Sequence, residues 1–169
     1  MKTKQSLLYL FILLFSISLA SCGTSQEASN KNFYAVYSHK LGVNLTGKEN
    51  KKLIKSMAEW KGTPYKYGGT TKSGVDCSGF VGSVYNEVYS KKLHRTSRDM
   101  IKDVRKISKK SLETGDLIFF KTSGKKISHV GIYITDNKFI HAASKGVVVN
   151  DLDQSYYKKT YYKSGKVKM

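Results

Sequence analysis

The sequence has few cysteines, few acidic residues and no long apolar run. Only two cysteines, Cys22 and Cys77, occur in the 169 residues, so the chain is no disulfide-rich scaffold. The uncharged apolar stretch from Leu7 to Ile17 is too short to be a comfortable transmembrane helix. There is no internal repeat and no second linker, which leaves a single domain as the simplest organisation.

The first 21 residues have the features of an export signal. Lys2 and Lys4 precede the apolar stretch, which gives way to Leu19-Ala20-Ser21-Cys22. This ending resembles the bacterial lipobox, in which cleavage leaves the cysteine, here Cys22, as a lipid-bearing N-terminus. The alternative is an ordinary cleaved signal that happens to end in cysteine. Because Gly23 provides no aspartate retention signal, we expect an anchor in the outer membrane of a Gram-negative cell, with the protein facing the periplasm.

Lipidation of Cys22 would leave Cys77 without a disulfide partner. A lone thiol in an oxidising compartment is a liability unless it has a function. This favours a chemical role for Cys77, with a buried structural cysteine as the alternative.

Basic residues outnumber acidic ones throughout the chain. The signal segment contains two lysines and no acidic residue, so the remainder has 28 Lys and Arg against 12 Asp and Glu, a net charge of +16. In a cytoplasmic protein this charge would suggest nucleic acid, whereas in an exported lipoprotein it indicates polyanionic envelope material. The lysines are scattered in pairs such as Lys91-Lys92 and Lys158-Lys159. We therefore interpret the charge as long-range attraction and solubility, and expect no nucleic-acid partner.

Composition divides the mature chain into a tether and one domain. Residues 22–32 are small and polar without periodicity, which predicts a flexible tether. Residues 33–169 are enough for one domain of ordinary size, which we expect to be a monomer. Apolar periodicity predicts helices over 48–61 and from Cys77 onward, and a short third helix after Ser97 that uses Met100, Ile101 and Val104.

After Gly115 the pattern changes to short strands rich in β-branched and aromatic residues. The predicted strands cover 116–121, 128–135, 138–143 and 146–150, and the tail is expected to form a turn or helix and a last edge strand near Lys166. Short connections imply antiparallel neighbours. The fold class is therefore α+β, with N-terminal helices packed on an antiparallel sheet.

Cys77, His129 and His141 form the candidate catalytic set. Cys77 would stand at the start of a helix, where backbone amides favour a thiolate and can stabilise an oxyanion. The two histidines lie on neighbouring strands joined by an Asp136-Asn137 turn, and equal parity places both side chains on one sheet face. This arrangement predicts that His129 is the base and that His141 orients it.

The segments around these residues resemble the NlpC/p60 family of cell-wall cysteine peptidases. In chain order they are PYKYGG (64–69), DCSGF (76–80), GDL (115–117), HVGIY (129–133) and HA (141–142). The resemblance implies a papain-like fold and hydrolysis of amide bonds in the stem peptides of peptidoglycan, with no cofactor and no metal. The implied bond joins D-glutamate to diaminopimelate, or is the D-alanyl-diaminopimelate crosslink.

By motif position, the resemblance implies a role for each member of the site. Cys77 matches the nucleophile, His129 the general base and His141 the third polar residue. Tyr65 matches a tyrosine whose hydroxyl lies beside the nucleophile and helps with the oxyanion.

The resemblance also implies substrate contacts. Asp76 and Ser78 match positions that contact the amine end of the substrate in relatives, and we expect Arg95 and Ser128 to be substrate contacts as well. His94 and Met100 depart from the common pattern, which bears on substrate contacts more than on catalysis. His94 and His39 are interpreted as surface or loop residues.

Three alternatives stay open at this point. An amidase that cuts between the glycan and the first amino acid is the nearest enzymatic rival. A hydrolase could instead use Cys77, His129 and His141 as zinc ligands. A non-catalytic envelope-binding lipoprotein would have the fold without turnover.

Overall fold

The computed structural model describes residues 25–169, of which residues 37–169 form one compact unit. The predicted signal peptide and Cys22 lie outside the described residues. The flexible tether expected over 22–32 differs from the structure, because a helix covers residues 25–41. Its first turn contains Gln26, Glu27 and Ala28, which are good helix formers, and no glycine or proline interrupts the run. Within the described part of the chain, no helix is long and apolar enough to cross a bilayer.

Helix α2 (Lys51–Trp60) confirms the first predicted helix. It begins after Asn50, whose side chain accepts a hydrogen bond from the Leu53 amide at 3.1 Å and so caps the unpaired end of the helix. The apolar stripe predicted from the sequence is buried, with Leu53, Ile54 and Met57 all fully covered. This face of α2 packs against α3.

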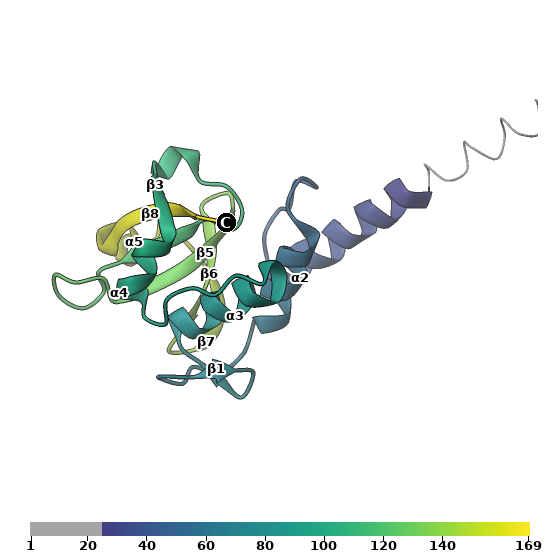
Figure 1. Cartoon of the computed structure of the whole chain (residues 1–169). Coiled ribbons are helices and arrows are strands. Elements are labelled where there is room, and N and C mark those ends of the chain that lie inside the picture. Colours follow the sequence, from purple (N-terminus) through teal and green to yellow (C-terminus); the bar gives the residue numbers. More distant parts are fainter. Residues whose placement is uncertain (1–24) are drawn as a thin grey trace, which may run out of the picture. The chain divides into compact units, whose positions relative to one another are not determined.

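Helix α3 (Cys77–Tyr89) begins at Cys77, as predicted. Its buried stripe includes Phe80, Val81 and Val84, and it packs against the central strands β5 and β6 (Figure 1). The glycine-rich loop before it contains a two-stranded ribbon of β1 (Thr70–Thr71) and β2 (Gly74–Val75). The helix start is therefore fixed between this ribbon and the sheet.

The sheet has six strands in the order β3-β8-β4-β5-β6-β7, and every neighbouring pair is antiparallel. The strands are β3 (Val104–Ile107), β4 (Leu117–Phe120), β5 (His129–Thr135), β6 (Lys138–Ala143), β7 (Gly146–Asp151) and β8 (Tyr161–Val167). The shorter helices are α4 (Ser97–Met100), η1 (Ile101–Asp103), η2 (Lys109–Ser111) and α5 (Ser155–Thr160). The predicted α+β class is confirmed.

Two sequence expectations about the sheet are wrong. Val104 was assigned to the third helix but begins β3, because α4 ends at Met100 and only a single 3-10 turn follows it. The last strand is not at an edge, since β8 pairs with both β3 and β4. The pairing of β3 with β8 joins segments about 60 residues apart, and local pattern does not reveal such a partner.

Two glycines in α3 give a matched test of packing at the helix start. A Cβ on Gly79 would lie 2.2 Å from the Gly69 carbonyl oxygen, whereas a Cβ on Gly82 meets nothing within 4 Å. Gly79→Ala should therefore lower the free energy of unfolding by about 1–3 kcal/mol through overpacking. Gly82→Ala should raise it by up to about 1 kcal/mol through helix propensity. Urea unfolding of both variants measures this, and a shift of the same sign and size in both would contradict the packing argument.

Candidate active site

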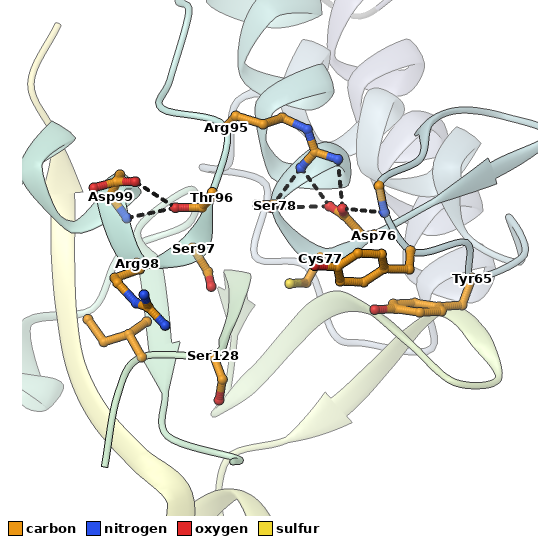
Figure 2. A pocket seen from close by; sticks show the side chains of 13 residues that line it. Tyr65, Asp76, Cys77, Ser78, Arg95, Thr96, Ser97, Arg98, Asp99 and Ser128 are labelled. Carbon is orange, nitrogen blue, oxygen red and sulfur yellow. Dashed lines mark hydrogen bonds and ion pairs between the residues drawn. The ribbon is translucent and has the colours of Figure 1, made fainter. Parts of the chain in front are cut away.

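Cys77 lies at the base of a cleft of about 600 Å³. It is the first residue of α3 and is only 9% exposed. The cleft is lined by Tyr65, Tyr67, Gly68, Asp76, Cys77, Ser78, Arg95, Thr96, Ser97, Arg98, Asp99, Ile127 and Ser128 (Figure 2). It therefore gathers six of the residues predicted from the sequence, and the two histidines lie outside its lining.

The Asp76 carboxylate is fully engaged within the protein. It caps α3 by accepting from the Gly79 amide at 2.7 Å, and it accepts from the Gly68 amide at 3.0 Å and the Ser78 hydroxyl at 3.1 Å. Arg95 adds a bidentate contact, with its two terminal nitrogens at 2.9 and 2.6 Å from the carboxylate oxygens (Figure 2). Burial opposes ionisation of Asp76, but the hydrogen bonds from Arg95 and Gly79 outweigh it and lower the pKa of the carboxyl.

Three of the residues predicted to contact substrate, Asp76, Ser78 and Arg95, are thus hydrogen-bonded to one another. Arg95 donates to Ser78 at 2.9 Å as well as to Asp76, so the three residues form one hydrogen-bonded group in the cleft wall. The Arg95 side chain stays 46% exposed. Asp76 and Ser78 are buried and hydrogen-bonded within this group, and Arg95 has the most exposed side chain of the three.

Ser128 and Tyr65 lie on other walls of the cleft. The Ser128 hydroxyl accepts from the amides of Thr122 and Ser123 at 2.9 and 3.1 Å, which fixes the turn before β5. Tyr65 is 41% exposed, and Figure 2 shows its hydroxyl turned toward the side of the pocket that holds Cys77. Burial, followed by the charges of Cys77 and Asp76, raises the pKa of the Tyr65 phenol, so it is a hydrogen-bond donor at neutral pH.

His129 and His141 contact each other directly. Nε2 of His129 lies 2.7 Å from Nδ1 of His141, which confirms that the two side chains share one sheet face. On its far side, Nε2 of His141 lies 2.9 Å from Oδ1 of Asn150 and 3.3 Å from the Tyr157 hydroxyl. His141 is 1% exposed and stacks on Phe139 at a centroid distance of 4.7 Å.

The sulfur of Cys77 is adjacent to this pair. The backbone amide of Val130, the residue after His129, donates a hydrogen bond to the Cys77 sulfur. Because Nε2 of His129 is hydrogen-bonded to His141, Nδ1 is the ring nitrogen that remains as an acceptor for the thiol proton. The start of α3 and the beginning of β5 thus lie next to each other, with Cys77 on the helix and His129 on the strand.

The resting charges differ from the expectation of a thiolate. Burial raises the pKa of the Cys77 thiol, and the hydrogen bond from Val130 only partly offsets it. Burial and the neighbouring His141 lower the pKa of His129 to about 3, and burial lowers that of His141 to about 4 despite the contact with Asn150. The helix-start effect is outweighed because the sulfur is nearly out of contact with water. The set is therefore a neutral thiol beside neutral imidazoles.

The geometry of the donors does not match a zinc site. Across residues 25–169, no three His, Cys, Asp or Glu side chains are placed to share one ion. The facing nitrogens of His129 and His141 are hydrogen-bonded to each other rather than directed at a common point. The alternative of three zinc ligands thus lacks a converging set of donors.

The sequence profile of the NlpC/P60 family matches residues 62–166. This range includes the cleft and both histidines. The chain belongs to the NlpC/P60 family.

Individual relatives agree with this membership. The chain is 33% identical over 165 residues to the Escherichia coli protein named murein DD-endopeptidase MepS/murein LD-carboxypeptidase, covering 90% of this chain and 87% of that protein. It is 41% identical over 119 residues to a probable endopeptidase NlpC homolog of Haemophilus influenzae, covering 70% of this chain and 63% of that protein. The crystal structure of a Staphylococcus aureus NLP/P60 family protein, described as similar to lipoprotein, aligns with a TM-score of 0.65, with 27% identity over 72% of this chain and 43% of that one. The NlpC fold expected from the motifs is confirmed.

Some residues of this NlpC/P60 site were not found from the sequence. Asn150 and Tyr157 contact His141 from β7 and α5, and nothing in their sequence setting marks them as site residues. Tyr67 and Arg98 line the cleft, and the proximity of Tyr67 to Tyr65 in the PYKYGG segment was an available signal. Met100 is fully buried, so its departure from the common pattern concerns the core. His39 and His94 are exposed, as predicted.

The buried histidines predict an acid-sensitive fold. An unfolded histidine titrates near 6.5, whereas His129 and His141 titrate at about 3 and about 4 in the folded state. The unfolded chain binds more protons between these values, so the free energy of unfolding should fall as the pH drops from about 6.5 toward 4. Replacing either histidine by glutamine should flatten this dependence in urea unfolding at pH 7, 6 and 5. Parallel curves for the wild type and both variants would contradict the depressed pKa values.

Proposed function

We propose that the protein is a peptidoglycan hydrolase, a cysteine endopeptidase that cleaves amide bonds in the stem peptides of the cell wall. One observation carries the proposal: the sulfur of Cys77, in the cleft, lies against the amide that follows His129, and His129 is bonded to His141. Membership of the NlpC/P60 family supports the same chemistry. The name of one relative, a murein DD-endopeptidase, supports a peptidoglycan substrate.

The first half of the reaction is acylation of Cys77. As the sulfur attacks the amide carbonyl, its proton passes to Nδ1 of His129, so no free thiolate has to be held at rest. The negative charge that forms on the carbonyl oxygen is stabilised by backbone amides at the start of α3 and by the Tyr65 hydroxyl. The His129 imidazolium then protonates the leaving nitrogen, the C–N bond breaks, and a thioester remains on Cys77.

The second half is hydrolysis of the thioester. Neutral His129 removes a proton from a water molecule, whose oxygen forms the new bond to the carbonyl carbon. The C–S bond breaks, the His129 imidazolium returns this proton to the sulfur, and the product leaves as a carboxylic acid. His141 holds the His129 ring in place during both halves.

Two stem-peptide bonds fit this chemistry. The resemblance in sequence gave the D-glutamyl-diaminopimelate bond first, but the relative covered over 87% of its length is named a DD-endopeptidase, which favours the D-alanyl-diaminopimelate crosslink. The Arg95 side chain is 46% exposed in the cleft wall, and its guanidinium is paired with Asp76. Mass spectrometry of the products from defined muropeptides separates these bonds from each other and from the glycan–peptide bond cut by an amidase.

The proposed place of action is the cell envelope. Lipidation at Cys22 would tether a monomer to the outer membrane, facing the periplasm and within reach of the cell wall. The net charge of +16 without the signal segment adds long-range attraction to the anionic envelope.

Replacing the nucleophile tests the proposed reaction. Cys77→Ala and Cys77→Ser should each reduce release of muropeptides from purified sacculi by at least about 10³-fold, because no other group can form the thioester. Circular dichroism and thermal unfolding should show a folded domain in both variants. Digestion by Cys77→Ala at the wild-type rate would refute the proposal.

Inhibitors provide a control on the same preparation. Iodoacetamide should abolish activity of the wild type, and a metal chelator should leave it unchanged. The opposite pattern would favour the zinc alternative.

The anchor has its own test. Cells expressing the full chain and fed an alkyne-tagged fatty acid should label the wild type but not Cys22→Ser, and only the wild type should sediment with membranes. Cys77→Ser serves as the control for thiol labelling elsewhere in the chain. Equal labelling of Cys22→Ser and the wild type would contradict lipidation at Cys22.

A further inference from the structure

Asn150 extends the line of polar groups that begins at Cys77. It lies on β7 opposite Phe139 of β6, while His141 pairs with Val148. By strand alternation, Asn150, Phe139 and His141 therefore share one face of the sheet. The Oδ1 of Asn150 lies 2.9 Å from Nε2 of His141, which makes it the group directly behind the histidine pair.

The chemistry of these atoms fixes where the protons are. A side-chain amide oxygen can only accept, so Nε2 of His141 carries the hydrogen of this bond. In a neutral imidazole the other nitrogen is then a bare acceptor, so Nδ1 of His141 accepts from Nε2–H of His129. By the same rule Nδ1 of His129 has a free lone pair, which is what a base facing the Cys77 thiol requires.

The orientation of the Asn150 side-chain amide decides which nitrogen of each histidine carries a hydrogen. If Asn150 were turned over, its NH₂ group would donate to His141, both imidazoles would change tautomer, and Nδ1 of His129 would carry a hydrogen instead of a lone pair. Two contacts from the α5 region fit the first orientation. Nδ2 of Asn150 donates to Oε1 of Gln154 at 3.1 Å, and the Tyr157 hydroxyl donates to Oδ1 of Asn150 at 3.3 Å.

We propose that Asn150 is a positioning residue that sets the tautomers of His141 and His129. As a result, Nδ1 of His129 is left unprotonated and can accept the proton of the Cys77 thiol. This inference rests on the proposed function for its kinetic consequence, but it concerns a residue that touches neither substrate nor sulfur. Asn150 does not line the cleft, so it should act on the chemical step rather than on substrate binding.

Few other ionisable groups face the pair. His141 is flanked by His129 from β5 and by Tyr157 from α5, and Cys77 lies beyond His129 on α3. Lys138 and Asp151 are paired with each other at the neighbouring positions of β6 and β7, on the opposite sheet face by alternation. A change at Asn150 thus alters the environment of the histidines without breaking another ion pair.

Two substitutions of similar size separate the acceptor role from a packing role. Asn150→Leu has no acceptor, so kcat on a purified crosslinked muropeptide should fall about 10- to 100-fold with little change in KM, as is typical for loss of a residue that orients another. Asn150→Asp is an acceptor only, so it should keep kcat within about threefold by the same reasoning. Its carboxylate should also move the acidic limb of the kcat/KM profile to higher pH, because it favours a protonated imidazole. Asn86→Ala, at an exposed position of α3, is the control and should match the wild type.

The rate at which iodoacetamide alkylates Cys77 at pH 7 provides a readout that needs no substrate. It should fall in Asn150→Leu and be maintained in Asn150→Asp, with thermal unfolding confirming that each is folded. If Asn150→Leu fails to fold, Asn150→Asp alone decides through its pH profile. Wild-type kcat and alkylation in Asn150→Leu, or a loss in Asn150→Asp as large as in Asn150→Leu, would overturn the inference. Undiminished digestion by Cys77→Ala would instead refute the proposed function, and the alkylation rates would still test Asn150.

Discussion

The hydrogen bond between Nε2 of His129 and Nδ1 of His141 is the interaction on which the site depends. It requires two strands to bring these two nitrogens within 2.7 Å of each other, and the packing around the rings leaves little freedom. A Cβ on Gly131 would lie 3.1 Å from Cβ of His141 and 2.8 Å from the Phe139 ring, so the position beside the bond has no room for a side chain. Phe139 in turn stacks under His141. The bond is therefore a product of strand pairing and core packing, which hold the His129 ring, the proposed base, in place before any substrate arrives.

A second constraint fixes Cys77, the proposed nucleophile. The Asp76 carboxylate caps α3, holds the glycine-rich loop through Gly68 and neutralises Arg95. One group thus positions the helix start that carries Cys77, the loop at the cleft rim and the cation in the cleft wall. Because burial raises the pKa of the thiol, the proposed reaction depends on His129 as a nearby proton acceptor and not on a standing negative charge. This distinguishes the site from the thiolate that a helix start alone would suggest.

Features that are set by local sequence pattern were predictable, whereas features that depend on pairing between distant segments were not. The start of α3 at Cys77 and the strand at 138–143 were predictable because turn residues and apolar periodicity mark their ends. The interior place of β8 and the existence of β3 depend on partners far along the chain. The bidentate contact of Arg95 with Asp76, the buried environment of the thiol and the role of Asn150 depend on side-chain positions in space. Spacing and composition therefore could not reveal these features, although six of the thirteen residues that line the cleft were predicted as site residues.

The central claim is that the hydrogen bonds of His129 and His141 leave Nδ1 of His129 unprotonated. The protonation state of the ring nitrogens tests this claim most directly. Two-bond ¹H–¹⁵N spectra of the histidine side chains, recorded on the folded protein at pH 7, distinguish protonated from bare ring nitrogens. The account predicts that His129 and His141 are both neutral, each with a hydrogen on Nε2 and a bare Nδ1. A hydrogen on Nδ1 of His129 would leave no lone pair for the Cys77 thiol and would contradict the account.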